Sequence, residues 1–172
     1  MGRRRRPGAG AACGGLGSLN WRARLYGIVL LLHGLWRWVV IAAGAAALAT
    51  AALGLSRAAP WQPGAGRFAR LFGIALDVQV LMGASLYLVF SPLTNEVQRV
   101  AGDVGADTEV HFFGARHALI MACAFISVHV AAVLVRRTPG DRAKHRRALL
   151  LYGCTLLLVL AGTPWWRPLA RF

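Results

Sequence analysis

Two histidines inside long apolar segments are the residues best placed to do chemistry in this chain. His33 and His117 each lie about two turns into such a segment, and the two segments would cross a bilayer in the same direction. An ionisable side chain at membrane depth is costly and by default marks a functional site. Two neutral imidazoles at matched depth are what haem with two axial ligands requires. The pair therefore predicts a haem site with His33 and His117 as metal ligands.

Two arginines would complete such a site. Arg37 follows His33 by four residues, so the two share one face of a helix. Arg37 or Arg116, which directly precedes His117, would neutralise a haem propionate near the outer surface. Large apolar side chains that would wall a porphyrin, or serve as plain helix packing, are Trp36, Trp38, Phe112, Phe113 and Met121.

The same polar residues also suit a structure without a cofactor. Arg37 lies too deep in its helix to reach the surface comfortably, and Asp77 lies at a similar depth on the next helix, so we predict an ion pair between them. Each imidazole would then bind a backbone carbonyl or a side chain such as Gln79. This alternative predicts a structural polar network that includes Asp77 and Gln79.

The other histidines and the cysteines indicate no second site. His129 follows His117 by twelve residues, a rotation of about 120°, so the two face different ways and one haem is the most that the chain supports. We interpret His129 as a packing or interfacial residue, and His111 and His145 as solvated loop residues. The three cysteines, which lack metal-ligand spacing, are Cys13, Cys123 and Cys154.

Four apolar segments must position these residues. They cover residues 25–55, 68–90, 112–135 and 148–162, and each approaches or exceeds the roughly 20 residues of a spanning helix. Ser91-Pro92 would end the second helix, and a turn at 138–141 would separate the third from the fourth. The sequence thus predicts an all-α, integral membrane, four-helix up-down bundle. Aromatic residues near the segment ends fit lipid interfaces and are Trp21, Tyr26, Trp61, Trp165 and Trp166.

The flanking sequences are basic. Residues 1–24 are rich in Gly, Ala and Arg, and this composition predicts a disordered basic tail. The four apolar segments form one domain of residues 25–166. Residues 167–172 follow it as a short basic C-terminal tail. A cleavable signal peptide is not indicated, because the first apolar run continues to Leu55.

Charge is distributed unevenly around the segments. Lys and Arg total 20 against 6 Asp and Glu, but most basic residues lie at segment ends, where lipid headgroups rather than nucleic acid attract them. Loop 136–147 is rich in Arg and Lys, whereas the connection 91–111 is mainly acidic. We therefore expect a multi-pass protein of the bacterial inner membrane with loop 136–147 in the cytoplasm.

Small residues recur every four positions on the first segment, at Ala42, Ala46, Thr50 and Gly54. Such a ladder lets another helix approach closely. It would serve packing within the chain or the contact of a homo-oligomer.

With these positions identified, residues 26–166 resemble a family of short four-helix bacterial membrane proteins labelled cytochrome b or cytochrome b-like. The resemblance is carried by His33 to Trp38, Leu76 to Gln79, Tyr87 to Pro92, His117 after two phenylalanines, and Ala143 to Arg147. One departure is Arg116, where such proteins often have Glu, and this puts an acidic partner of the histidine in doubt. The resemblance implies a haem-b electron carrier, or an anchor for one.

Two functions follow from these observations. The first is a haem-b electron-transfer subunit that works with a redox partner protein or a quinone, rather than an independent enzyme. The alternative is a cofactor-free membrane scaffold or small transporter-like bundle. The sequence contains no phosphate-binding loop and no nucleophile or metalloprotease motif, so it indicates neither a kinase nor a hydrolase.

Overall fold

A computed structural model describes residues 13–90 and 112–165 of the chain, and four long helices make up most of these residues. They are α1 (Cys13–Ser56), α2 (Pro63–Ser85), α5 (His117–Arg137) and α6 (Asp141–Gly162). Two short π-helical turns, η1 (Leu86–Phe90) and η2 (Phe112–Arg116), lie directly before and after residues 91–111. All four long helices are long and apolar enough to cross a membrane. The predicted all-α class is confirmed, and the composition is that of a multi-pass membrane protein.

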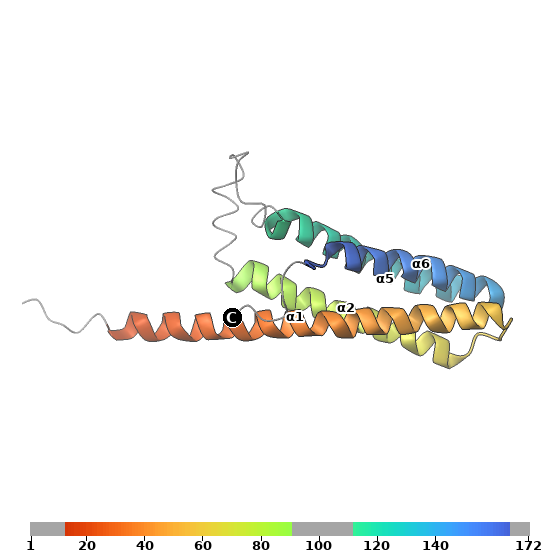
Figure 1. Cartoon of the computed structure of the whole chain (residues 1–172), viewed down its shortest axis with the longest axis horizontal. Helices are drawn as coiled ribbons and strands as arrows, with labels where there is room; N and C mark the ends of the chain where they lie inside the picture. Colours follow the sequence, from red (N-terminus) through yellow and green to blue (C-terminus); the bar gives the residue numbers. More distant parts are fainter. Residues whose placement is uncertain (1–12, 91–111, 166–172) are drawn as a thin grey trace, which may run out of the picture.

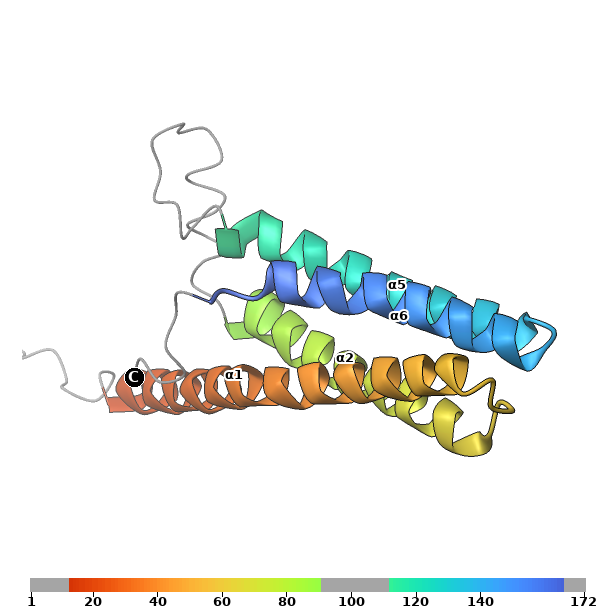
Figure 2. The same ribbon diagram turned by 45° about the vertical axis from the view of Figure 1, so that its right-hand side comes forward.

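The helices form a ring of four neighbours. The closely packed pairs are α1 with α2, α1 with α6, and α5 with α6, while α2 and α5 pack against each other less extensively. Helices α1 and α5 are therefore diagonal partners across the bundle. The α1–α2 and α5–α6 connections lie at the same end in both ribbon views (Figures 1 and 2). We call this the basic end, after Arg57, Arg67, Arg137 and Arg142, which lie at or near the helix ends there.

Some helix boundaries differ from the predicted ones. Helix α1 begins at Cys13, so residues 13–24, predicted as tail, are helical. Helix α6 begins at Asp141 rather than 148, directly after Gly140 with its φ of 77°. Residues 142–148 are mostly Arg, Ala and Lys, which favour helix, and Asp141 in the first turn suits the helix dipole. Helix α2 begins at Pro63, since proline fits the first helical turn.

Several predictions lie outside the described residues. These are the first half of the N-terminal tail, the acidic connection 91–111 with His111, and the C-terminal tail 167–172.

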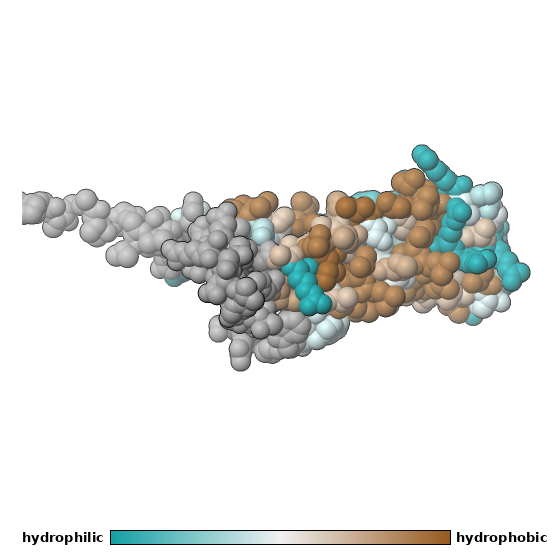
Figure 3. All heavy atoms as spheres, turned by 90° about the horizontal axis from the view of Figure 1, so that it is seen from above, coloured by the Kyte–Doolittle hydropathy of each residue, from teal (hydrophilic) through white to brown (hydrophobic). Residues whose placement is uncertain are grey.

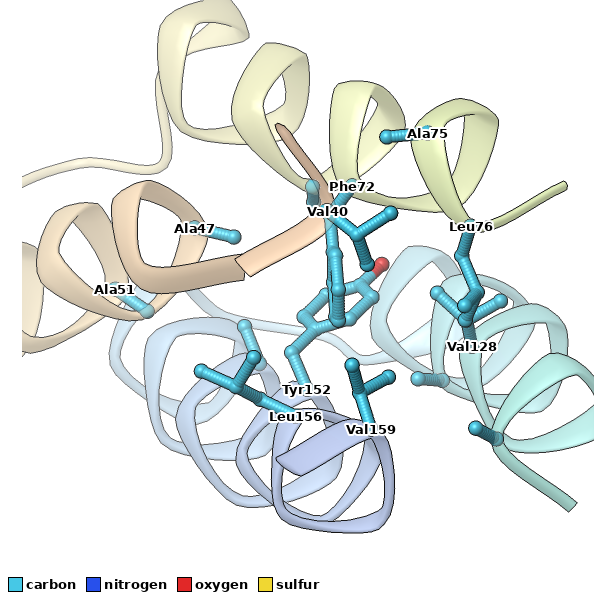
Figure 4. Packing of buried hydrophobic residues seen from close by; sticks show 14 of the residues in the cluster. Val40, Ala47, Ala51, Phe72, Ala75, Leu76, Val128, Tyr152, Leu156 and Val159 are labelled. Carbon is cyan, nitrogen blue, oxygen red and sulfur yellow. The ribbon is translucent and has the colours of Figure 1, made fainter. Parts of the chain in front are cut away.

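The core is narrow and built largely from small or aliphatic side chains. Val40, Phe72, Leu76 and Val128 are almost fully buried, and Figure 4 shows side chains from the four helices converging between them. A Cβ atom on Gly44 would lie 2.9 Å from Leu156 and 3.0 Å from Phe72. The absent side chain therefore lets α1 approach both α2 and α6.

The outer surface is apolar over the length of the helices. Figure 3 shows mainly hydrophobic residues along the side of the bundle in view, with most of the hydrophilic ones gathered at the basic end. Large apolar side chains such as Leu81, Leu119 and Leu157 point outward and are about two-thirds exposed. In a bilayer these side chains contact lipid, and the basic end lies among the headgroups.

Candidate functional site

The two predicted ligands meet inside the bundle. His33 comes from α1 and His117 from the first turn of α5, and their ring centroids lie 6.3 Å apart with the planes at 78°. Twenty residues separate His117 from Arg137, about 30 Å of helix, so the pair lies near the membrane boundary opposite the basic end. The structure therefore brings together the two histidines that the sequence singled out.

His117 is held by a backbone carbonyl of α6. Its Nδ1 lies 2.7 Å from the carbonyl oxygen of Gly162. A carbonyl only accepts, so Nδ1 carries the proton and donates it. The lone pair is left on Nε2. Histidines that bind a metal commonly donate their other ring N–H to a backbone carbonyl in this way, so the bond to Gly162 would suit a metal on Nε2. The rings of Phe112 and Phe113 each lie 5.9 Å from the His117 ring and enclose it on the η2 side.

His33 is held by Gln79 of α2. The Gln79 side-chain nitrogen lies 3.2 Å from His33 Nε2 and 3.1 Å from the His33 carbonyl oxygen. An amide nitrogen only donates, so Nε2 is the accepting atom and Nδ1 carries the proton. Gly83 leaves room for the ring, because a Cβ there would lie 3.1 Å from His33 Cε1. The lone-pair nitrogen of His33 is therefore engaged by Gln79.

Three buried polar atoms near the pair have no hydrogen-bond partner among the described residues. They are His33 Nδ1, Arg37 Nε and Gln79 Oε1. The Arg37 guanidinium carbon lies 5.5 Å from the centroid of the neighbouring Trp38 ring, within range of a cation–π contact. Buried polar groups are normally paired, and here two N–H donors and one amide oxygen, which only accepts, are left without a partner.

The predicted ion pair between Arg37 and Asp77 is wrong. Asp77 Oδ1 instead lies 3.0 Å from His129 Nε2 on α5. Gln79 faces α1, and a residue two positions earlier on the same helix is rotated by about 200° from it. Asp77 therefore points away from Arg37. Counting residues gave a similar depth for the two charges but not the direction in which each points.

Arg116, the second arginine predicted for the site, is exposed, whereas Arg37 has a buried Nε. Arg116 ends η2 directly before His117, and its side chain is exposed. It lies at the same end of the bundle as the histidine pair.

Sequence reasoning missed the burial of His145, which is 2% exposed rather than solvated. Its ring lies 4.8 Å from the Trp61 ring and against Gly54 of α1. His145 shares a helical face with Ala148, Tyr152 and Leu156, all buried, and this spacing is the signal that would have revealed it.

The small-residue ladder of α1 serves packing within the chain at its Gly54 end. A Cβ on Gly54 would overlap the His145 ring of α6. Thr50 donates to the carbonyl oxygen of Ala46 within α1, and Ala42 is exposed.

Comparison with protein-family models, curated proteins and solved structures finds no match to this chain. The resemblance to cytochrome b-like proteins therefore stays a prediction, and the geometry carries the functional argument.

The paired imidazoles fit the ligand set of haem. Imidazole nitrogens bind first-row metals at about 2 Å, so rings on opposite sides of one metal have centroids roughly 6 Å apart. The separation of 6.3 Å is of this size, but His33 Nε2 faces the Gln79 amide, so the His33 ring would have to lose that bond before both imidazoles could hold one metal. Only two protein ligands are needed, because the porphyrin nitrogens fill the other four positions of the iron.

Proposed function

We propose that this chain is a haem-b-binding, cytochrome b-like electron-transfer subunit of the bacterial inner membrane, with His33 and His117 as axial ligands. The observation that carries the proposal is the approach of these two imidazoles from diagonal helices to 6.3 Å. The hydrogen bond from His117 to Gly162 supports it, because this bond leaves the His117 Nε2 lone pair free for a metal.

The residues around the pair have distinct roles in this proposal. Gly162 keeps His117 in one tautomer and orientation. Gln79 must release His33 Nε2 before that atom can act as a ligand, and Arg37 supplies a positive charge for a propionate. Phe112 and Phe113 exclude water from the His117 ring. Bound haem would supply one-electron transfer, while the chain sets its position and surroundings.

The position of the pair indicates where electrons would enter or leave. The histidines lie near the boundary opposite the basic end, and basic loops favour the cytoplasm. With loop 136–147 in the cytoplasm, the site faces the outer side of the membrane. A redox partner protein or a quinone would meet it there.

A cofactor-free scaffold or transporter-like bundle is the alternative function. The bonds of His33 to Gln79 and of His117 to Gly162 favour it, since both imidazoles have protein partners. The network is incomplete, however, because three buried polar atoms beside it have no hydrogen-bond partner among the described residues. We therefore favour the haem-binding function.

The test is a reduced-minus-oxidised absorption spectrum of the purified full chain, expressed with ample haem. We expect one haem b per chain, with the characteristic reduced bands lost in His33→Ala and in His117→Ala. His129→Ala is the matched control, because this intramembrane histidine lies outside the pair and should leave the bands unchanged. Haem-replete protein without these bands, or with bands that survive both pair substitutions, would contradict the proposal.

A further inference from the structure

A polar pair lies on the outer face of the bundle at membrane depth. His129 Nε2 and Asp77 Oδ1 are 3.0 Å apart, and their side chains are 50% and 35% exposed. His129 lies eight residues before Arg137, about 12 Å along α5 from the basic end and so within a hydrocarbon core of about 30 Å. A lipid chain offers no hydrogen bond there, so exposure of this pair is costly.

Each member of the pair has an atom left to bond. Neither His129 Nδ1 nor the second oxygen of Asp77 has a hydrogen-bond partner among the described residues. An imidazolium has two N–H donors, one for its own carboxylate and one for another, and a carboxylate has two oxygens to accept them. The pair is therefore complementary to a second copy of itself.

An apolar groove and a projecting apolar side chain lie beside the pair. A shallow groove of about 290 Å³ runs along α5 from His129 toward the basic end and is lined by His129, Val130, Val133 and Leu134. Ile74 lies one turn from Asp77 in the same direction along α2 and is 58% exposed. The projecting side chain and the groove thus lie at similar depths.

We propose that this face of α2 and α5 is the contact surface of a two-fold symmetric homodimer in the membrane. A two-fold axis along the membrane normal places α2 of one copy opposite α5 of the other and keeps every residue at its own depth. His129 of each copy then bonds Asp77 of the other, and Ile74 enters the facing groove. Interhelical hydrogen bonds between polar side chains are an established cause of helix association in lipid.

The first test measures association of the full chain in lipid vesicles, by energy transfer between donor- and acceptor-labelled copies as the protein is diluted with lipid. We expect His129→Phe to weaken association about tenfold or more. Val130→Trp, which fills the groove but keeps the polar pair, should weaken it as well, so a folding defect at His129 cannot explain both results. Leu157→Trp, at an exposed position on α6, is the matched control and should have no effect.

A second measurement identifies the face. In a chain with its native cysteines replaced by serine, copies carrying Ile74→Cys should form disulfides with copies carrying Val133→Cys. Copies with Leu53→Cys and copies with Leu157→Cys, exposed positions on α1 and α6, should not. The dimer would be overturned if the chain were a monomer at every lipid dilution, or if His129→Phe and Val130→Trp both left its association unchanged. Disulfides formed through the α1 and α6 positions would overturn it too. A monomer that binds a short-chain hydroquinone through His129 would also overturn it. None of these outcomes depends on haem.

Discussion

At the residue scale, the two imidazoles of the central pair are held by different hydrogen bonds. His117 donates from Nδ1 to Gly162, whereas His33 accepts from Gln79 at Nε2. The two imidazoles that we propose as ligands of one metal therefore differ in whether Nε2 is free to bind it. The His117 Nε2 lone pair is free for a ligand, and the His33 Nε2 lone pair is engaged by a side chain that must first move away.

Gln79 should therefore oppose haem binding. We expect Gln79→Leu to raise the affinity for haem by roughly 2- to 10-fold, because one net hydrogen bond is worth about 0.5–1.5 kcal/mol and no longer has to be broken. The measurement is a haem titration of the apoprotein in detergent, followed by absorbance. Gln62→Leu is the control, since Gln62 is exposed and distant in sequence from the pair. A lower affinity in the Gln79 variant would instead make Gln79 a supporting residue of the bound state.

At the element scale, helices approach one another where side chains are small. Gly44 admits Phe72 and Leu156, and Gly54 admits the buried His145 ring. These contacts fix how α6 lies against α1, and through α6 they fix the carbonyl of Gly162 that holds His117. Packing near the basic end is therefore connected to the histidine site by one continuous helix.

Gly54→Ala should destabilise the bundle by about 1–3 kcal/mol, the usual cost of forcing an extra carbon into a packed interior. The added Cβ would overlap the His145 ring, which must move. The measurement is unfolding in mixed micelles at rising denaturant. Gly34→Ala on the same helix is the matched control, because its Cβ meets nothing within 4 Å and alanine favours helix. If Gly54→Ala and wild type were equally stable, α1 and α6 could make room for the added Cβ without a loss of stability.

At the scale of the whole molecule, charge and hydropathy together favour one orientation in a membrane. The side in view is mainly apolar (Figure 3), both described helix connections lie at one end, and basic residues in or next to the four long helices gather there. Basic loops of membrane proteins favour the cytoplasm. In the orientation that we propose, the His33–His117 pair lies toward the outer side, and the His129–Asp77 pair lies deeper, nearer the cytoplasmic side.

Thiol labelling of intact cells tests this orientation in a chain whose native cysteines are replaced by serine. We expect an impermeant reagent to label Pro139→Cys only after the inner membrane is opened, because Pro139 lies in the exposed α5–α6 turn at the basic end. Ala115→Cys, exposed in η2 at the opposite end, should react in intact cells once the outer barrier is permeabilised. The reverse pattern would place the histidine pair on the cytoplasmic side.

The sequence alone determined the four membrane-spanning helices, their up-down order and the two histidines that meet, because length, hydropathy and a matched position along parallel helices need no knowledge of neighbours. Tertiary structure alone decided the partners. Asp77 bonds His129 rather than Arg37, Gln79 engages His33, and His145 is buried in the space left by Gly54. The physical reason is that a partner depends on the rotation of each helix about its axis and on which helices become neighbours. Both are set by packing of the whole bundle rather than by any one segment.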